Sequence, residues 1–264
     1  MNTLVIPDLH QRINIATGIL ERESANVDQV VFLGDYFDVR SGESDASSAN
    51  DVCEWLESTA QSLGERGIWL IGNHDIHYYE ELAFPEIYPR SGRHPFKKYA
   101  CSGYSRETAK RIRKHFKSMD HSFWANLRIH HQINDILMSH AGIHPRNLIS
   151  FLSLEENISL IQKEWSRTVA NMNIDHHATE LYNIGYCRGG NYEIGNILWQ
   201  DWDHEFISTP DIRQIVGHTY HPTPRIMDNN FNIDTKCQHY IKIIDGKFID
   251  IYDKQGILIE YEQT

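Results

Sequence analysis

Carboxylate, amide and imidazole side chains recur together in this sequence, and each group of them directly follows a short apolar segment. Such side chains bind borderline or hard divalent ions such as Mn, Fe, Zn or Mg. The four cysteines lie far apart in the chain, which argues against a soft ion or a closed structural zinc site. The groups, in chain order, are Asp8-Leu9-His10, Gly34-Asp35-Tyr36-Phe37-Asp38, Gly72-Asn73-His74-Asp75, Ser139-His140-Ala141-Gly142 and Gly217-His218-Thr219.

The number and order of these groups carry more weight than any one of them. A single Asp-x-His string arises by chance, and a single histidine at a strand end is more often a hydrogen-bonded structural residue. Five groups that each follow an apolar strand predict one shared site. Two cations placed close together in such a site need a ligand that touches both, and a carboxylate can do so. The glycines let the backbone turn sharply beside it.

The elements that must position these groups are short buried strands that alternate with helices. In α/β sheets, ligands bind beyond the carboxyl ends of the strands, which is where the polar groups lie. Residues 231–261 have a different pattern from the rest of the chain. It predicts short alternating strands with a hairpin turn at Asp245-Gly246. The apolar segments that precede the five groups are residues 4–6, 29–33, 68–71, 136–138 and 214–216.

Three segments between the strands have apolar residues at helical spacing. They predict helices at residues 49–63, 105–116 and 154–169. The second carries a strongly basic face. The third begins with Ser153 and Glu156 at capping-box spacing. The alternation of strands and helices therefore predicts an α/β layered fold.

The order D-x-H, G-D-x-x-D, G-N-H-D, H-A-G and G-H-T, over about residues 5–234, resembles the calcineurin-like metallophosphoesterase superfamily. The resemblance implies a four-layer α/β/β/α sandwich with a dinuclear site at the strand C-terminal ends, and one catalytic domain over residues 1–264. The Ser-His-Ala-Gly string and residues 232–235 are similar to the phosphoprotein-phosphatase branch. Residues 101–104, 187–190 and 198–202 are similar to a group of bacterial and phage metallophosphatases.

Carried over position by position, the resemblance implies roles for particular residues. His74 would act as general acid toward the leaving oxygen, while Asp38 accepts a hydrogen bond from its other nitrogen. A hydroxide between the two ions would attack phosphorus in line. His221 would be a further ligand only if one residue of displacement from the usual G-H-x-H position is tolerated. The implied ligands are Asp8, His10 and Asp35 for one metal, and Asp35, Asn73, His140 and His218 for the other.

The sequence departs from the phosphoprotein-phosphatase pattern at the arginines that grip phosphate. Val39 stands where an arginine is expected after G-D-x-x-D, and Trp199-Gln200-Asp201 stands where Trp-x-Arg is expected. A phosphate monoester dianion still calls for a bidentate cation. We expect Arg188, beside two glycines, to supply it, with Arg40 and then Arg106 as alternatives. Gln11 replaces the usual glycine after the first histidine, which we expect to affect substrate access and not the ligands.

Composition narrows the function classes. The 36 acidic and 25 basic residues give a formal charge of −11, which does not suit a protein held to nucleic acid or an anionic membrane by a general positive field. The basic run between residues 106 and 117 is interpreted as a solvated helix face. The four separate cysteines are typical of reduced thiols in a cytoplasmic protein. No apolar run approaches the length of a membrane span, and the first residues show no signal peptide.

The sequence therefore predicts a metal-dependent phosphoric ester hydrolase whose partner is a phosphorylated substrate and not a membrane. Phosphate monoesters, in a phosphoprotein or a small metabolite, are the expected substrates. The alternatives are a dinucleoside polyphosphate or other phosphoanhydride, then nucleic acid, and last a non-catalytic scaffold. We expect two divalent ions, with manganese first and iron, zinc, nickel, cobalt or magnesium as alternatives.

Overall fold

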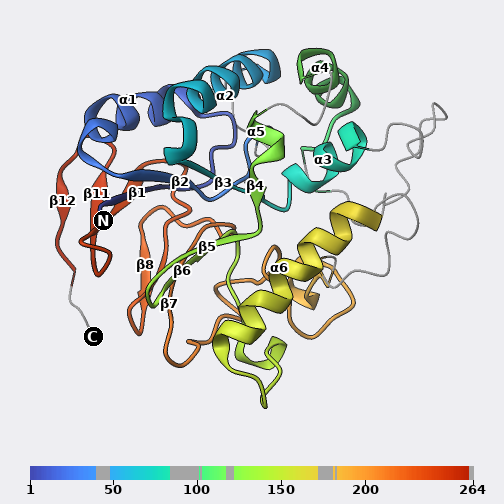
Figure 1. The fold of residues 1–264 in the computed structure, drawn as a ribbon, viewed down its shortest axis with the longest axis vertical. Helices are drawn as coiled ribbons and strands as arrows, with labels where there is room; N and C mark the ends of the chain where they lie inside the picture. Colours follow the sequence, from blue (N-terminus) through green and yellow to red (C-terminus); the bar gives the residue numbers. More distant parts are fainter. Residues whose placement is uncertain are drawn as a thin grey trace.

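Two β-sheets lie face to face between outer helices in this protein (Figure 1). The structure is a computed structural model that describes residues 1–39, 48–83, 101, 103–116, 122–171, 181 and 183–261. The helix–sheet–sheet–helix layering confirms the α/β layered fold expected from the sequence.

The first sheet has the strand order β12-β11-β10-β1-β2-β3-β4, with a parallel half and an antiparallel half. β1 and β10 pair antiparallel, so the C-terminal strands extend the sheet begun by the N-terminal strand. The turn between β10 and β11 has positive φ at Asp245 and Gly246, which confirms the predicted hairpin. The strands are β1 (Thr3–Ile6), β2 (Gln29–Phe32), β3 (Gly67–Leu70), β4 (Leu127–Arg128), β10 (His239–Ile244), β11 (Phe248–Asp253) and β12 (Leu258–Ile259).

The second sheet has the order β5-β6-β7-β9-β8. β6, β7 and β9 run parallel, while β5 and β8 run antiparallel to their neighbours at the two edges. β4 and β5 lie outside the elements expected from the sequence, because short strands give little periodic signal. The strands are β5 (His130–Ile133), β6 (Ile136–Ser139), β7 (Arg213–Val216), β8 (Arg225–Met227) and β9 (Asn230–Asn232).

Two apolar cores follow from the alternation of side chains along the strands. Val5 and Val31 point into the core between the sheets, where they meet Met138 and Ile215 of the second sheet. Their neighbours in sequence, such as Phe32, face the helices in the other core. Both faces of these strands are buried, which explains why they appear in the sequence as continuous apolar runs.

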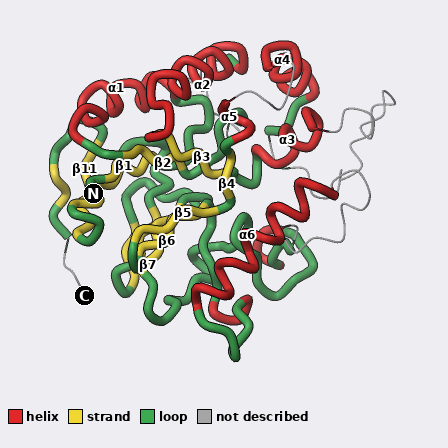
Figure 2. The backbone as a smooth tube through the Cα atoms, viewed as in Figure 1, coloured by secondary structure: helices red, strands yellow, loops and turns green. Residues whose placement is uncertain are grey.

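α1 and α2 cover the outer face of the first sheet, and α6 lies beside the second (Figure 2). Ser48 and Asp51 form a capping box on α2, and Ser153 and Glu156 exchange the two hydrogen bonds of the predicted box on α6. No helix within the described ranges is long and apolar enough to cross a membrane. The helices are α1 (Ile13–Glu23), α2 (Ala49–Leu63), α3 (Asp75–Ala83), α4 (Arg106–Phe116), α5 (Ser122–Ala125) and α6 (Leu154–Asn171), with 3-10 turns at Ser24–Asn26, Gly64–Arg66, Pro145–Asn147 and Tyr186–Arg188.

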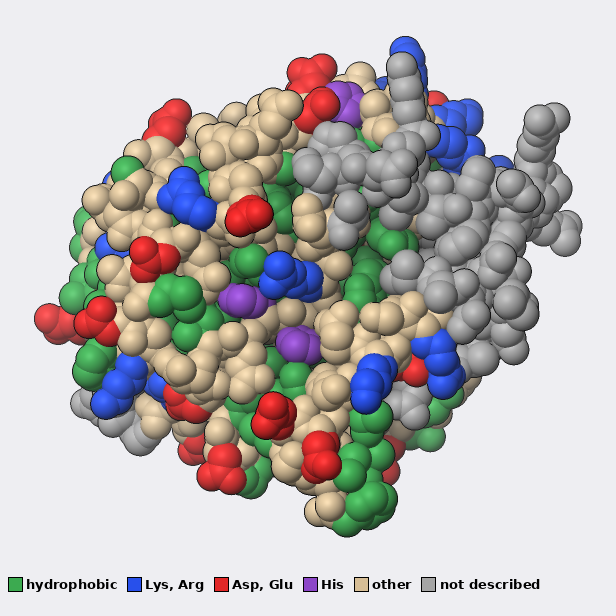
Figure 3. Space-filling view, viewed as in Figure 1, with side chains coloured by type: hydrophobic (Ala, Val, Ile, Leu, Met, Phe, Trp, Pro, Cys, Tyr) green, Lys and Arg blue, Asp and Glu red, His purple; other side chains and the backbone are tan. Residues whose placement is uncertain are grey.

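The basic helix α4 buries its apolar side and leaves its charged side in solvent. Ala109, Ile112 and Phe116 are buried, while Lys110 pairs with Glu107 in solvent. Figure 3 shows acidic and basic side chains interspersed over the viewed face, with basic ones gathered near α4. This arrangement matches the interpretation of the basic run as a solvated helix face.

Candidate metal centre

The predicted ligands come from loops that follow parallel strands of both sheets. Asp8, Asp35 and Asn73 follow β1, β2 and β3 of the first sheet, and His140 and His218 follow β6 and β7 of the second. Because the carboxyl ends of these strands meet at one edge of the sandwich, residues more than 200 positions apart come into contact. The backbone N–H of His218, for example, donates to Oδ2 of Asp8 at 2.8 Å.

Asp8, His10 and Asp35 form the first group of potential metal ligands. All three are buried, and one donor atom from each lies within 4.8 Å of the other two. The Nδ1–H of His10 donates to the carbonyl of Asp38 at 2.8 Å, so Nε2 carries the lone pair. That nitrogen lies 3.4 Å from Oδ2 of Asp35. A lone pair directed at a carboxylate oxygen is what a shared cation requires.

Asn73, His140 and His218 form the second group. The Nδ1–H of His140 donates to the carbonyl of Leu33 at 2.9 Å, which leaves its Nε2 as an acceptor. This nitrogen faces Oδ1 of Asn73 at 2.8 Å and Nδ1 of His218 at 3.2 Å, and the same oxygen lies 2.9 Å from His218 Nδ1. Burial lowers the pKa of His140, which favours the neutral ring. Oxygen and nitrogen atoms that converge in this way fit a divalent cation between them.

Asp35 lies between the two groups. Its Oδ2 is 3.4 Å from Nε2 of His10 and 3.5 Å from Nε2 of His140. Burial opposes ionisation, but three surrounding histidines, His140 first, hold the pKa of this carboxyl well below its ordinary value. Asp35, the carboxylate that the sequence indicated as the bridge, therefore faces ring nitrogens of both groups.

The backbone of the site is strained at the residues that carry donors. His10, Asp35 and His218 all have positive φ, at 42°, 54° and 65°, a conformation that residues other than glycine seldom adopt. Two glycines make room for the carboxylates. A Cβ at Gly72 would collide with Oδ1 of Asp35, and one at Gly217 would collide with Oδ1 of Asp8.

Asp75, the last residue of G-N-H-D, holds two of the loops together. Its Oδ2 accepts from the backbone N–H groups of Asp35 and Gly72 at 2.7 and 3.0 Å, and its Oδ1 accepts from Tyr36 at 2.8 Å. Burial and the charge of Asp35 raise the pKa of Asp75 to about 8, which the three backbone donors oppose. This role of Asp75 was not predicted from the sequence, although its place in the motif was a usable signal.

His74 lies beside the first group and is held by Asp38. Its Nδ1 is 3.0 Å from Oδ2 of Asp38, and its ring meets the ring of His10 edge-on with centroids 5.2 Å apart. Burial alone would lower the pKa of His74, but the charges of Asp35 and Asp38 outweigh it and raise the pKa to about 9. Tyr78, which the sequence analysis did not single out, donates its O–H to Oδ1 of Asp38 at 2.5 Å.

Arg188 reaches the residue that follows His218. Its Nη2 donates to Oγ1 of Thr219 at 2.7 Å and pairs with Oδ2 of Asp201 at 2.9 Å. A Cβ at Gly190 would collide with the carbonyl of Ile184, so one neighbouring glycine does mark close packing. Of the two alternative arginines, Arg40 lies outside the described residues, and Arg106 is exposed at the start of α4.

Two further positions have local structural partners. The Gln11 side chain is buried and donates to the carbonyl of Phe37, so it ties the first loop to the second. The expected effect of Gln11 on substrate access stays a prediction. Nδ1 of His221 lies 2.8 Å from the carbonyl of Thr223 within its own turn.

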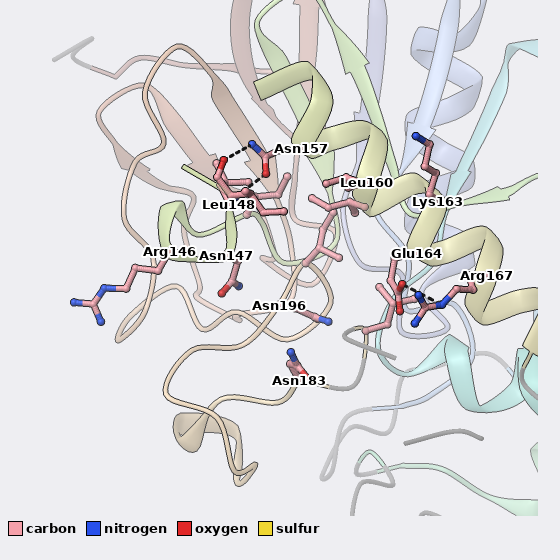
Figure 4. Close-up of a pocket in the computed structure, with 15 residues that line it drawn as sticks. Arg146, Asn147, Leu148, Asn157, Leu160, Lys163, Glu164, Arg167, Asn183 and Asn196 are labelled. Atoms are coloured by element: carbon pink, nitrogen blue, oxygen red, sulfur yellow. Dashed lines mark hydrogen bonds and ion pairs between the residues drawn. The ribbon is translucent and has the colours of Figure 1, made fainter. Parts of the chain in front are cut away.

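A separate cavity of about 540 Å³ opens beside α6 (Figure 4). Among the described residues that line it, none is a predicted metal ligand. Its wall combines apolar side chains with amides and an ion pair between Glu164 and Arg167. The lining residues are Ile143, Arg146, Asn147, Leu148, Ile149, Asn157, Leu160, Ile161, Lys163, Glu164, Arg167, Leu181, Asn183, Asn196 and Ile197.

Residues 1–222 match the calcineurin-like phosphoesterase family, and the chain belongs to that family. It is therefore a metal-dependent phosphoric ester hydrolase, and the family implies divalent metal ions at a site whose residues fit them. Among curated proteins, none matches the sequence.

Solved structures of phosphatases are similar in fold. One is a cold-active protein-tyrosine phosphatase of a psychrophilic Shewanella species, at 14% identity and a TM-score of 0.60, over 98% of this chain and 79% of that one. A second structure of a cold-active protein tyrosine phosphatase, with 14% identity, gives a TM-score of 0.61 over 98% and 78%. A putative diadenosine tetraphosphatase, at 13% identity and a TM-score of 0.47, covers 96% and 93%. At these identities the likeness establishes the fold alone.

Proposed function

We propose that this protein hydrolyses phosphate monoesters with two divalent cations, manganese first among them. The position of Asp35 carries the proposal, because its Oδ2 lies 3.4 and 3.5 Å from donor nitrogens of the two ligand groups. Asp8 and His10 complete the first group, and Asn73, His140 and His218 complete the second. When bound, the two cations neutralise charge on the phosphoryl oxygens and make a water molecule more acidic.

The His74–Asp38 pair supplies the proton for the leaving oxygen. Because Nδ1 of His74 faces Asp38, its other ring nitrogen is the one that donates to substrate. The two nearby carboxylates favour the protonated ring, since they raise the pKa of His74 to about 9. The side chain is 14% exposed, so a substrate can reach it. This pair matters most when the leaving group is poor.

Arg188 holds the phosphate of the substrate. Thr219 and Asp201 fix one end of its guanidinium next to His218. A guanidinium attracts the two negative charges of a monoester dianion more strongly than the single charge of a diester monoanion. This position supports monoesters, of a phosphoprotein or a small metabolite, over the diesters of nucleic acid. All four cysteines carry free thiols, which supports a reducing, cytoplasmic location.

A comparison of two model esters tests the proposal. We would assay p-nitrophenyl phosphate and bis-p-nitrophenyl phosphate with added manganese, using the wild type and the Asp35→Asn variant. The expected result is turnover of the monoester by the wild type alone, together with loss of metal from the variant by elemental analysis. Preferential turnover of the diester would refute the monoester proposal, and a variant that kept both metals and its rate would refute the bridging role.

A further inference from the structure

Cys101 and residues 103–105, here called the buttress, lie against both working parts of the proposed site. In the sequence, the string Cys101-Ser102-Gly103-Tyr104 carries a family resemblance but no assigned role. In the structure Cys101 contacts a predicted metal ligand. Residues 103–105 contact Asp38 and the tyrosine that donates to it.

At one end of the buttress, Cys101 contacts the side-chain amide nitrogen and the backbone carbonyl of Asn73. The Nδ2 of Asn73 donates to Sγ of Cys101 at 3.1 Å, and Sγ in turn donates to the backbone carbonyl of Asn73 at 3.2 Å. A carboxamide has a donor end and an acceptor end of nearly the same shape, so its partners decide which end faces a site.

Because the thiol occupies the donor end, Oδ1 of Asn73 is directed at the two imidazoles. It lies 2.8 Å from Nε2 of His140 and 2.9 Å from Nδ1 of His218. An amide turned the other way would present N–H groups to the same space and would repel a cation there. Cys101 therefore selects the amide orientation that can bind a metal ion.

At the other end, residues 103–105 hold Asp38 through Tyr78. A Cβ at Gly103 would lie 2.9 Å from the carbonyl oxygen of Val39 and 3.2 Å from Cβ of Asp38, so the backbone packs directly on the loop that carries this carboxylate.

Tyr104 and Ser105 fix the phenol of Tyr78. The ring of Tyr104 stacks on that of Tyr78 with centroids 5.2 Å apart, and the N–H of Ser105 donates to the Tyr78 oxygen at 3.1 Å. The phenol then donates to Oδ1 of Asp38, which leaves Oδ2 for His74.

We infer that the buttress is a positioning element with two separable tasks. Cys101 orients Asn73 toward the second metal ion. Tyr78, fixed by Tyr104 and Ser105, orients Asp38 toward His74. The inference rests on the proposed function for the second task, whereas the first concerns metal binding alone.

The first task is tested by titrating manganese into metal-free protein by calorimetry. Cys101→Ala is expected to weaken one of two manganese sites by about 10- to 100-fold and to leave the other unchanged, as is typical when a partner of a metal ligand is removed. Cys101→Ser retains a donor and an acceptor and is expected to recover most of the affinity. Cys53→Ala, which removes a buried thiol from α2, is the matched control and should keep both affinities. Thermal unfolding without metal checks that each variant folds.

The second task is tested with Tyr78→Phe, which keeps the ring and removes the hydroxyl. We expect unchanged manganese affinity, and a loss of kcat that is larger for an alkyl phosphate than for p-nitrophenyl phosphate.

Unchanged affinity at both sites in folded Cys101→Ala would overturn the first task, and an equal loss of kcat on both esters in Tyr78→Phe would overturn the second. If Cys101→Ala weakened one site while the wild type hydrolysed no ester, the positioning of Asn73 would stand and the proposed function would fall.

Discussion

Replacing Arg188 with alanine separates a phosphate-binding arginine from one that only forms a surface ion pair. The guanidinium contacts Thr219 and Asp201, and its side chain is 28% exposed. Because the Asp201 side chain is only 9% exposed, loss of the pair costs more than loss of a surface pair, roughly 1–3 kcal/mol in the free energy of unfolding. Asp201 also keeps its hydrogen bonds from Asp203 and His204 when the arginine is lost. We therefore expect Arg188→Ala to fold, with a lower free energy of unfolding.

The expected effect on binding is separate from the effect on stability. Hydrogen bonds to a charged group contribute about 1.5–3 kcal/mol, which corresponds to roughly 10- to 150-fold in the KM for a phosphate monoester. Asp201→Asn leaves the guanidinium in place, so it is the matched control and should change KM by only a few fold. Arg188→Lys keeps the charge without the planar fork and should recover part of the loss.

The assay is steady-state kinetics on p-nitrophenyl phosphate over a range of substrate concentrations, with chemical denaturation of each variant alongside. A rise in KM for Arg188→Ala that greatly exceeds the rise for Asp201→Asn supports phosphate binding. Equal kinetic constants in wild type and Arg188→Ala would refute it, and so would the same modest change in both variants, which is what a structural ion pair predicts.

Three further changes have expected outcomes. His74→Asn should keep its metal and lose about 10²- to 10⁴-fold in rate on alkyl phosphates but far less on p-nitrophenyl phosphate, as kinetics on both esters would reveal. Gly217→Ala should lower the free energy of unfolding by about 1–3 kcal/mol, measured by urea denaturation, and should weaken metal binding, because its Cβ would displace the Asp8 carboxylate. Gly18→Ala, with open space around its Cβ, should do neither. Burial lowers the pKa of His131 to about 4, whereas the same imidazole has a pKa of about 6.5 in the unfolded chain. Between about pH 6.5 and 4 the imidazole therefore binds a proton in the unfolded chain but not in the folded one. Stability should therefore fall by about 1 kcal/mol from pH 7 to 5, after a discount for partial exposure, and denaturation of His131→Gln should show a smaller fall.

The sequence predicts the elements of the fold well where their periodicity is strong. Residues 49–63 form α2 with the predicted bounds, and each strand before a polar group begins and ends within one residue of its predicted range. β4, β5, β8, α1, α3 and α5 are missing from the prediction. The first two are short, and α3 begins inside the polar G-N-H-D string, where polar residues interrupt the apolar spacing typical of a helix.

The ligand candidates were accessible from the sequence because each one stands in a short string after a strand. Their geometry was not. Positive φ at His10 and His218 has only a weak local signal, since histidine adopts it far less often than glycine does. The conformation is imposed by contacts from other loops, such as the hydrogen bond from the His218 backbone to Asp8. The strained backbone at these ligands therefore depends on contacts between loops at the edge of the two sheets, and not on any one sequence motif.

The roles of Tyr78 and Cys101 could not be predicted from the sequence for a similar reason. Their roles depend on hydrogen bonds that span 40 and 28 positions, to Asp38 and Asn73, and no local pattern records such a pairing. A ligand in this site must be a carboxylate, amide or imidazole, so its residue type identifies it as a candidate. A residue that only orients a ligand needs one donor or acceptor in the right place, and a thiol, a phenol or a backbone N–H serves equally well. Its residue type is therefore weakly constrained, and only its contacts in the folded chain identify it.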